Sequence, residues 1–250
     1  MKILMTGAGG FLGSGMVEPF ARHGHTLRLL DVKPFSSRHE VMVADVSRYD
    51  ECVRAVEGVE ALVIAHVAGW RPDAYATPEL CFDVNVKGTA NLLFAAQEAG
   101  VRKAVVVSST GAINHTVDPP WSHTAPLQGK GLYGLTKACQ EMVAEHFVHE
   151  HGMQIASLRI GYVVDGDAMR DKYGRLVHER APLDTDRRDV GEVARLALEC
   201  EDLTYETLHV MSTVEAMDLW DVRYTCDRLG WTPRLDFDRL PLSPQFAKVT

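Results

Sequence analysis

The chain has few of the features that mark secreted, membrane or nucleic-acid-binding proteins. No apolar run approaches the roughly 20 residues of a membrane helix, and no signal peptide precedes the first apolar run at Ile3. The net charge of −8 does not favour a nucleic acid or an anionic membrane as partner. The cysteines are few and without Cys-x-x-Cys spacing, which predicts reduced thiols and a cytoplasmic protein; they are Cys52, Cys81, Cys139, Cys200 and Cys226.

Repeats and low-complexity segments are also absent, and the histidines form no convincing set of metal ligands, so we expect no metal site. What remains is an ordinary globular composition, with 250 residues of which 46% are hydrophobic and 24% are charged. This length fits one large domain, or a domain with a small appendage.

Short apolar runs alternate with longer amphipathic segments along the first two thirds of the chain. The apolar runs predict buried strands at Lys2–Thr6, Thr26–Asp31, Val41–Ala44, Ala61–His66, Ala104–Ser108 and Gln154–Ile160. The amphipathic segments predict helices at Phe11–His23, Tyr49–Glu57, Thr77–Ala99 and Leu132–His151. Repeated strand-then-helix units predict an α/β fold with a doubly wound parallel sheet.

After Ile160 this alternation loosens. The segment Tyr162–Arg188 is polar, and we expect it to be irregular. A helix at Val190–Cys200, a strand near Leu208–Met211, a helix near Met217–Leu229 and an irregular tail complete the prediction. We therefore expect a dinucleotide-binding core at 1–160 and a small substrate-binding lobe at 161–250, packed closely on the core.

A glycine-rich turn, Thr6–Gly13, directly follows the first predicted strand and opens a helix. In such a turn, Gly7 permits a tight bend, Gly10 lets the backbone approach a pyrophosphate, and Gly13 lets the helix pack closely. The N–H groups at the helix start, which includes Phe11 and Leu12, can then bind phosphate. These features predict a Rossmann-type dinucleotide site.

Asp31 ends the second predicted strand, about 20 residues further on, where a carboxylate accepts hydrogen bonds from the adenosine ribose. A 2′-phosphate would meet the negative charge of Asp31, so we expect NAD rather than NADP. Lys33 and Arg38 lie nearby and keep NADP open as an alternative.

Tyr133 and Lys137 are spaced to lie on one helical face. The charges of Lys137 and of a bound nicotinamide are expected to lower the pKa of Tyr133, which then takes a proton from a substrate hydroxyl. The hydroxyl residues Ser108, Ser109 and Thr110 follow a predicted strand, so they lie at the edge of the sheet where ligands bind.

Together these residues resemble the extended short-chain dehydrogenase/reductase family, the NAD-dependent epimerase/dehydratase group. The resemblance covers nearly the whole chain. Its motifs are Thr6–Gly13 (TGxxGxxG), Asp45-Val46, His66–Gly69, Asn85–Thr89 (NxxGT), Tyr133–Lys137 (YGxSK, with Thr for Ser), Arg159–Gly161 and Arg188–Val190.

The resemblance implies that Tyr133 is the catalytic base and acid, and that Lys137 binds the nicotinamide ribose and lowers the pKa of the tyrosine. The family's catalytic hydroxyl falls on Thr110, or on Ser109 if the strand shifts by one residue. The implied cofactor residues are Gly7, Gly10, Phe11, Leu12, Gly13, Asp31, Asp45, Val46, His66, Val67, Ala68, Asn85, Ser108, Tyr133, Lys137 and Ile160. The implied substrate residues are Gly69, Thr110, Arg159 and Arg188. Family members commonly form homodimers through two long helices, here 77–99 and 132–151.

The chain departs from sugar-nucleotide enzymes of the family in ways that favour a small substrate. It is shorter, no Asp-Glu pair follows Thr110, and Asn114 replaces the family tyrosine. In form it resembles the uronate dehydrogenases, whose substrate is a free sugar acid. Arg159 or basic residues between Lys172 and Arg188 are candidates to bind a carboxylate, and His115 and His123 are candidates to border the site.

We therefore expect an NAD-dependent dehydrogenase of a sugar-like alcohol or hemiacetal. Two alternatives stay open. One is a nucleotide-sugar epimerase, which returns the hydride to the same substrate. The other is a non-catalytic NAD(P)-binding sensor; such proteins often lack the tyrosine and lysine pair that this chain keeps.

Overall fold

The computed structural model describes residues 1–69, 77–113 and 119–246. A seven-stranded, all-parallel sheet forms the centre of the molecule, with the strand order β10-β6-β5-β4-β1-β2-β3. Its strands are β1 (Lys2–Thr6), β2 (Thr26–Asp31), β3 (Glu40–Val43), β4 (Ala61–Ile64), β5 (Lys103–Ser109), β6 (Gln154–Ile160) and β10 (Tyr205–Val210). The predicted fold class is confirmed.

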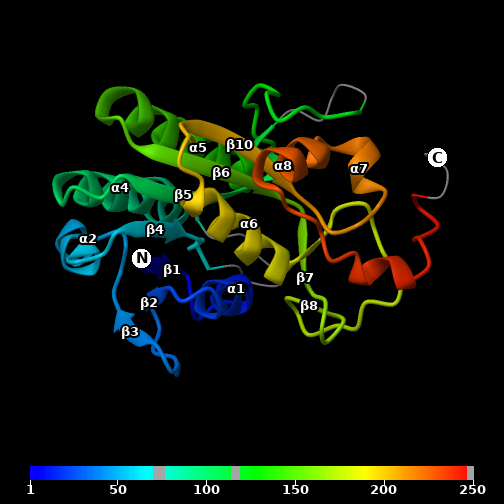
Figure 1. The fold of residues 1–250 in the computed structure, drawn as a ribbon, viewed down its shortest axis with the longest axis horizontal. Helices are drawn as coiled ribbons and strands as arrows, with labels where there is room; N and C mark the ends of the chain where they lie inside the picture. Colours follow the sequence, from blue (N-terminus) through cyan, green and yellow to red (C-terminus); the bar gives the residue numbers. More distant parts are fainter. Residues whose placement is uncertain (70–76, 114–118, 247–250) are drawn as a thin grey trace.

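Helices cover both faces of this sheet (Figure 1). Successive strand residues point to opposite faces, so Ile3 and Met5 join one hydrophobic core and Leu4 joins the other. The first core is closed by α1 (Phe11–Arg22) and α6 (Arg187–Glu199). The second is closed by α2 (Tyr49–Val56), α4 (Gly88–Glu98) and α5 (Gly131–His151).

Two of the predicted helices are interrupted. The predicted helix Thr77–Ala99 consists of α3 (Pro78–Cys81), the π-helical turn η1 (Phe82–Lys87) and α4. The predicted helix Met217–Leu229 is divided into α7 (Ala216–Leu219) and α8 (Val222–Leu229). The division falls at Trp220, which is extended and buried and whose ring lies 4.5 Å from that of Trp121.

The prediction that Tyr162–Arg188 is irregular is wrong. A second sheet, β8-β7-β9, lies there, formed by β7 (Tyr162–Asp165), β8 (Arg170–Asp171) and β9 (Asp184–Asp186). Short turns of 3-10 helix lie at η2 (Thr110–Ala112) and, in the predicted irregular tail, at η3 (Asp236–Arg239). Strand β10 joins the main sheet beside β6, so the C-terminal segment is partly built into the core. The predicted division into two parts at residue 160 stays a prediction.

The strand order determines where a ligand site can form. The chain runs from β1 outward to β2 and β3, then returns to place β4 on the other side of β1. In open parallel sheets, the crevice at such a reversal, beyond the carboxyl ends of the strands, is the usual ligand site. Among the described residues, no helix has the length and apolar character needed to cross a lipid bilayer.

Candidate active site

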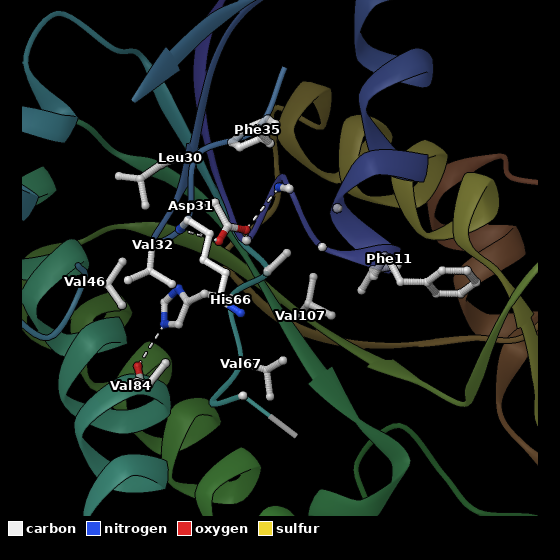
Figure 2. A pocket seen from close by; sticks show the side chains of 18 of the residues that line it. Phe11, Leu30, Asp31, Val32, Phe35, Val46, His66, Val67, Val84 and Val107 are labelled. Carbon is white, nitrogen blue, oxygen red and sulfur yellow. Dashed lines mark hydrogen bonds between the residues drawn. The ribbon is translucent and has the colours of Figure 1, made fainter. Parts of the chain in front are cut away.

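A pocket of about 800 Å³ lies at the carboxyl ends of β1, β2, β4 and β5. Most of the residues predicted to bind the cofactor lie around it (Figure 2). These are Gly7, Gly10, Phe11, Leu12, Gly13, Asp31, Asp45, Val46, His66, Val67, Ser108, Tyr133, Lys137 and Ile160, together with the predicted substrate residue Gly69. The predicted residues outside its lining are Ala68, Asn85, Ser109, Thr110, Arg159 and Arg188.

The glycine turn is closed so tightly that side chains are excluded from it. Gly7 has a φ of +68°, and a Cβ there would lie 2.7 Å from the carbonyl oxygen of Ala65. A Cβ on Gly13 would lie 2.2 Å from the carbonyl oxygen of Gly7. Helix α1 begins after Gly10 with no side-chain cap, so its first N–H groups and its dipole are available to an anion in the pocket.

Asp31, at the end of β2, accepts two backbone hydrogen bonds. Its Oδ2 accepts a hydrogen bond from the backbone N–H of Gly9 at 3.1 Å (Figure 2), and its Oδ1 accepts one from that of Lys33 at 3.2 Å. A fixed carboxylate at this position suits a ribose diol and opposes a 2′-phosphate. Lys33 and Arg38 were the two cations that favoured NADP as an alternative cofactor. Arg38 pairs with Glu18 at 3.1 Å, whereas Lys33 lines the pocket.

Motif matching missed the segment Val32–Phe35, which also lines the pocket. The ring of Phe35 lies against the glycine turn, 3.0 Å from where a Cβ on Gly9 would be. Val32 and Val46 add apolar surface below Asp31 (Figure 2). In the sequence, only their position indicates these residues, because they directly follow Asp31 at the end of a predicted strand.

His66 is a neutral part of the pocket wall. Its Nε2 donates to the carbonyl oxygen of Val84 at 3.0 Å, and its Nδ1 accepts from the hydroxyl of Thr6, 2.9 Å away. Because a carbonyl oxygen can only accept, this pairing fixes the tautomer. Burial, together with the nearby charge of Lys137, lowers the pKa of His66 to about 3.

Asn85 holds the pocket wall from behind rather than lining it. Its Oδ1 accepts from the backbone N–H of Ala68 at 2.7 Å, and its Nδ2 donates to Oγ1 of Thr136 at 3.0 Å. The side chain therefore ties the segment after β4 to helix α5. It comes from the π-helical turn η1, a conformation that is frequent at functional sites.

Tyr133 lies in the first turn of α5, with 38% of its surface exposed. The adjacent Gly134 permits this placement, since a Cβ there would lie 2.4 Å from the carbonyl oxygen of Gly111. Nζ of Lys137 is 5.9 Å from the centre of the Tyr133 ring.

The predicted fall in the pKa of Tyr133 includes the charge of a bound nicotinamide and stays a prediction. Although part of the Tyr133 side chain is exposed, desolvation of its phenol oxygen raises its pKa, and an interaction with Ser109 only partly opposes that rise. The protein's own groups alone therefore favour the neutral phenol.

Lys137 is buried one turn after Tyr133, and its Nζ donates to the carbonyl oxygen of Val107 at 2.8 Å. Burial lowers its pKa to about 8, and the charge of Glu141 opposes that change. At neutral pH the ammonium form therefore prevails.

Ser109 and Thr110, the two candidates for the catalytic hydroxyl, are both buried at the end of β5. Oγ of Ser109 accepts from the backbone N–H of Gly111 at 3.1 Å. Ser109 also interacts with the phenol of Tyr133, which acts to lower the pKa of that phenol.

Most of the basic residues predicted to bind a substrate carboxylate form ion pairs with carboxylates of the protein. Arg159 is buried against Glu141 at 2.8 Å, and Arg188 pairs with Asp186, Asp167 and Asp236. Among their neighbours, the same holds for Arg175 with Asp171, Arg180 with Glu215, and Arg187 with Asp165. Lys172 does line the pocket.

The two candidate histidines do not add to the site in the part of the chain that is described. His123 pairs with Asp221 at 2.5 Å and lines a second cavity, beside β10. His115, like Asn114, lies outside the described residues. Within those residues, no group of three His, Cys, Asp or Glu side chains could hold a metal ion.

The parallel sheet, the glycine turn and the strand-end aspartate define a dinucleotide-binding α/β protein. Residues 3–178 match the model of the NAD dependent epimerase/dehydratase family, and the chain belongs to this family. The family predicted from the motifs is thereby confirmed.

Comparison with known proteins identifies sugar dehydrogenases among the relatives. Uronate dehydrogenase of Pseudomonas syringae pv. tomato is 31% identical over 170 residues, which cover 64% of this chain and 58% of that protein. NAD-dependent glucose-6-phosphate dehydrogenase of Haloferax volcanii is 28% identical over 258 residues, covering 93% and 92%.

A solved structure shows the same fold. It is a mutant of uronate dehydrogenase from Agrobacterium tumefaciens complexed with NAD, with a TM-score of 0.74 and 23% identity, covering 93% of this chain and 84% of that one.

Proposed function

We propose that this protein is an NAD-dependent dehydrogenase that oxidises a free sugar acid at a hydroxyl-bearing carbon. One observation carries the proposal: Tyr133 and Lys137 lie in the same pocket as the glycine turn and Asp31. The uronate dehydrogenase relative supports the substrate class.

The residues present fit NAD. The uncapped start of α1 suits the pyrophosphate, Asp31 suits the adenosine ribose, and Val32 and Val46 give the adenine an apolar surface. Lys137 can donate to the nicotinamide ribose. When bound, NAD supplies the hydride acceptor.

In this mechanism Tyr133, as the phenolate, would accept the proton of the substrate hydroxyl, and bound NAD would supply the acceptor for the hydride of the same carbon. The substrate would lose one proton and one hydride and become a carbonyl compound. Lys137 favours the phenolate through its charge. Ser109 or Thr110 holds the reacting oxygen near Tyr133, and the interaction of Ser109 with the phenol is what supports Ser109.

The test is to incubate the protein with NAD and, separately, glucuronate, galacturonate, neutral sugars or UDP-sugars, while following the absorbance of NADH. We expect stoichiometric NADH with a uronate. An isomerised product without NADH would instead indicate an epimerase, and NAD binding without any turnover would indicate a sensor.

Lys172 is our candidate for binding the substrate carboxylate, because it is the cation of the 162–188 segment that lines the pocket. Lys172→Met is expected to raise KM for a uronate by about 10-fold, since charged hydrogen bonds contribute ~1.5–3 kcal/mol. KM for NAD should stay unchanged. Arg170→Met is the matched control, because Arg170 lies on the same hairpin, is exposed and donates to the carbonyl of Gly174. Equal KM values for Lys172→Met and the unmodified protein would contradict the assignment.

We further propose that two copies associate through α4 and α5. These helices carry exposed apolar side chains, Phe94 on α4 and Leu135 and Met142 on α5, which the same helices of a second copy would cover. Light scattering is expected to give twice the mass of one chain, and Phe94→Glu with Met142→Glu should reduce it to that of a monomer. A monomer before substitution would refute this proposal.

A further inference from the structure

Glu141 is a buried carboxylate on α5 that no part of the proposed reaction uses. It lies one turn after Lys137, and its side chain is fully buried. Arg159 on β6 holds it through Nη2 at 2.8 Å and through Nε at 3.1 and 3.2 Å. The hydroxyl of Ser108 donates to its Oε1 at 2.5 Å.

Two routes connect Glu141 to the candidate active site. Ser108 lines the pocket and follows Val107, whose carbonyl oxygen accepts the hydrogen bond from Nζ of Lys137. Glu141 is also four residues after Lys137, so the two side chains lie on the same face of the helix. Both are buried, so water does not screen their charges from each other.

We propose that Glu141 is a positioning residue whose charge, held in place by Arg159 and Ser108, keeps Lys137 in its ammonium form and so preserves activity at mildly alkaline pH. This role rests on the proposed function, because it acts through Lys137.

The other titratable groups near Lys137, Tyr133 and His66, are neutral and carry no charge that would stabilise its ammonium form. Tyr133 lies on the same helix and is neutral, since burial raises its pKa. His66, from the end of β4, is neutral because burial and the charge of Lys137 lower its pKa to about 3. Against the desolvation of Lys137, which lowers its pKa to about 8, Glu141 is the group that acts in the opposite direction.

The groups around Glu141 hold its charge in place. Arg159 faces it from β6 and also donates to the backbone carbonyl of His123 at 2.8 Å. Tyr205, on β10, donates through its hydroxyl to the backbone carbonyl of Glu141 at 3.2 Å. Burial and the charge of Glu141 raise the pKa of Tyr205, so this neighbour stays neutral.

The first measurement is the pKa of Lys137 itself, by NMR titration of the whole protein labelled with ¹³C at lysine Cε. Lys137→Met assigns the signal, and neither cofactor nor substrate is needed. We expect titration near pH 8 in the unmodified protein. In Glu141→Gln the pKa should fall by about one unit, because the negative charge that raises it is removed. In the double variant Glu141→Leu with Arg159→Leu it should also fall, but by less, because the positive charge of Arg159 is removed as well.

The double variant separates the effect of charge from that of stability. Glu141→Gln leaves Arg159 buried without a counter-charge, so Tm should fall by about 10 °C or more. The double variant, which removes both charges, should regain most of the Tm that Glu141→Gln loses. The pKa of Lys137 should still be lower than in the unmodified protein. Glu206→Gln is the matched control: Glu206 pairs with Arg228 at 2.6 Å and lies outside the pocket, so its loss should leave the Lys137 titration unchanged.

The second measurement is the pH profile of kcat/KM with a uronate. The alkaline limb reports loss of the Lys137 proton, and in the double variant it should move to lower pH by the same interval as the NMR titration. A folded double variant in which Lys137 titrates as before, or whose alkaline limb does not move, would overturn the inference. Full turnover by Lys137→Met would instead refute the proposed function, and the NMR shift would still stand.

Discussion

Tyr133→Phe is expected to lower kcat by about 10³-fold while leaving the Kd for NAD within about twofold, because general base catalysis contributes ~10²–10⁴-fold. The substitution removes a single oxygen atom, the proposed proton acceptor. The ring remains to pack beside Lys137, whose Nζ lies 5.9 Å from its centre. Initial rates of NADH formation give kcat, and calorimetric titration gives the Kd.

Two controls make this result specific. Tyr49→Phe removes the hydroxyl of another partly exposed tyrosine, on α2 and outside the pocket, and should leave kcat unchanged. Ser109→Ala and Thr110→Ala compare the two candidate hydroxyls, and we expect the larger loss at Ser109. A Tyr133→Phe variant that keeps a tenth of the turnover would exclude Tyr133 as the essential base.

The pKa values of Tyr133 and Lys137 in the protein alone differ from those that the proposed reaction needs. In the protein alone, the pKa of Lys137 is lowered to about 8, whereas that of Tyr133 is raised above its ordinary value. The proposed reaction needs the opposite order, a phenolate beside an ammonium. Because a positive charge next to the phenol favours the phenolate, we expect occupancy of the nicotinamide site to activate Tyr133.

Much of the main sheet could be predicted, because its strands are apolar runs separated by glycines. Gly24, Gly58, Gly100 and Gly152, which follow predicted helices, all have a positive φ. The small sheet β8-β7-β9 was missed because β8 and β9 are short and polar. Asp184 and Asp186 are fully or nearly fully buried in β9, and the charge of Asp186 is compensated by Arg188. A hydropathy pattern cannot show such compensation.

Some residues of the candidate site could be found from the sequence, and others could not. Residues in contiguous motifs, such as Gly7, Asp31 and Tyr133, could be found from the sequence because the local turn or helix fixes their relation. The ion pairs of several arginines could not be found in this way, because their partners lie far along the chain. Arg159 pairs with Glu141, 18 residues away, and Arg180 with Glu215, 35 residues away. Whether a cation faces a substrate or a carboxylate depends on packing between elements.

Gly7→Ala is expected to weaken NAD binding by about 100-fold, the equivalent of losing one or two charged hydrogen bonds at ~1.5–3 kcal/mol each. A Cβ at this position would lie 2.7 Å from the carbonyl oxygen of Ala65 and 2.8 Å from Cα of His66. Both atoms belong to the backbone, so the turn itself has to move. The start of α1 moves with it, away from the place where its N–H groups meet the pyrophosphate.

Gly24→Ala provides the comparison that separates this contact from backbone strain. Gly24 has a φ of +79°, close to the +68° of Gly7, but a Cβ there would have nothing within 4 Å. Both variants therefore share the cost of a left-handed alanine, about 1–2 kcal/mol, and both should lose similar stability from that source. Only Gly7→Ala should lose NAD affinity, as measured by calorimetric titration at a temperature where both proteins are folded. Equal affinity in the two variants would mean that the close contact with β4 does not position the turn, and that the phosphate-binding role of the α1 start needs another basis.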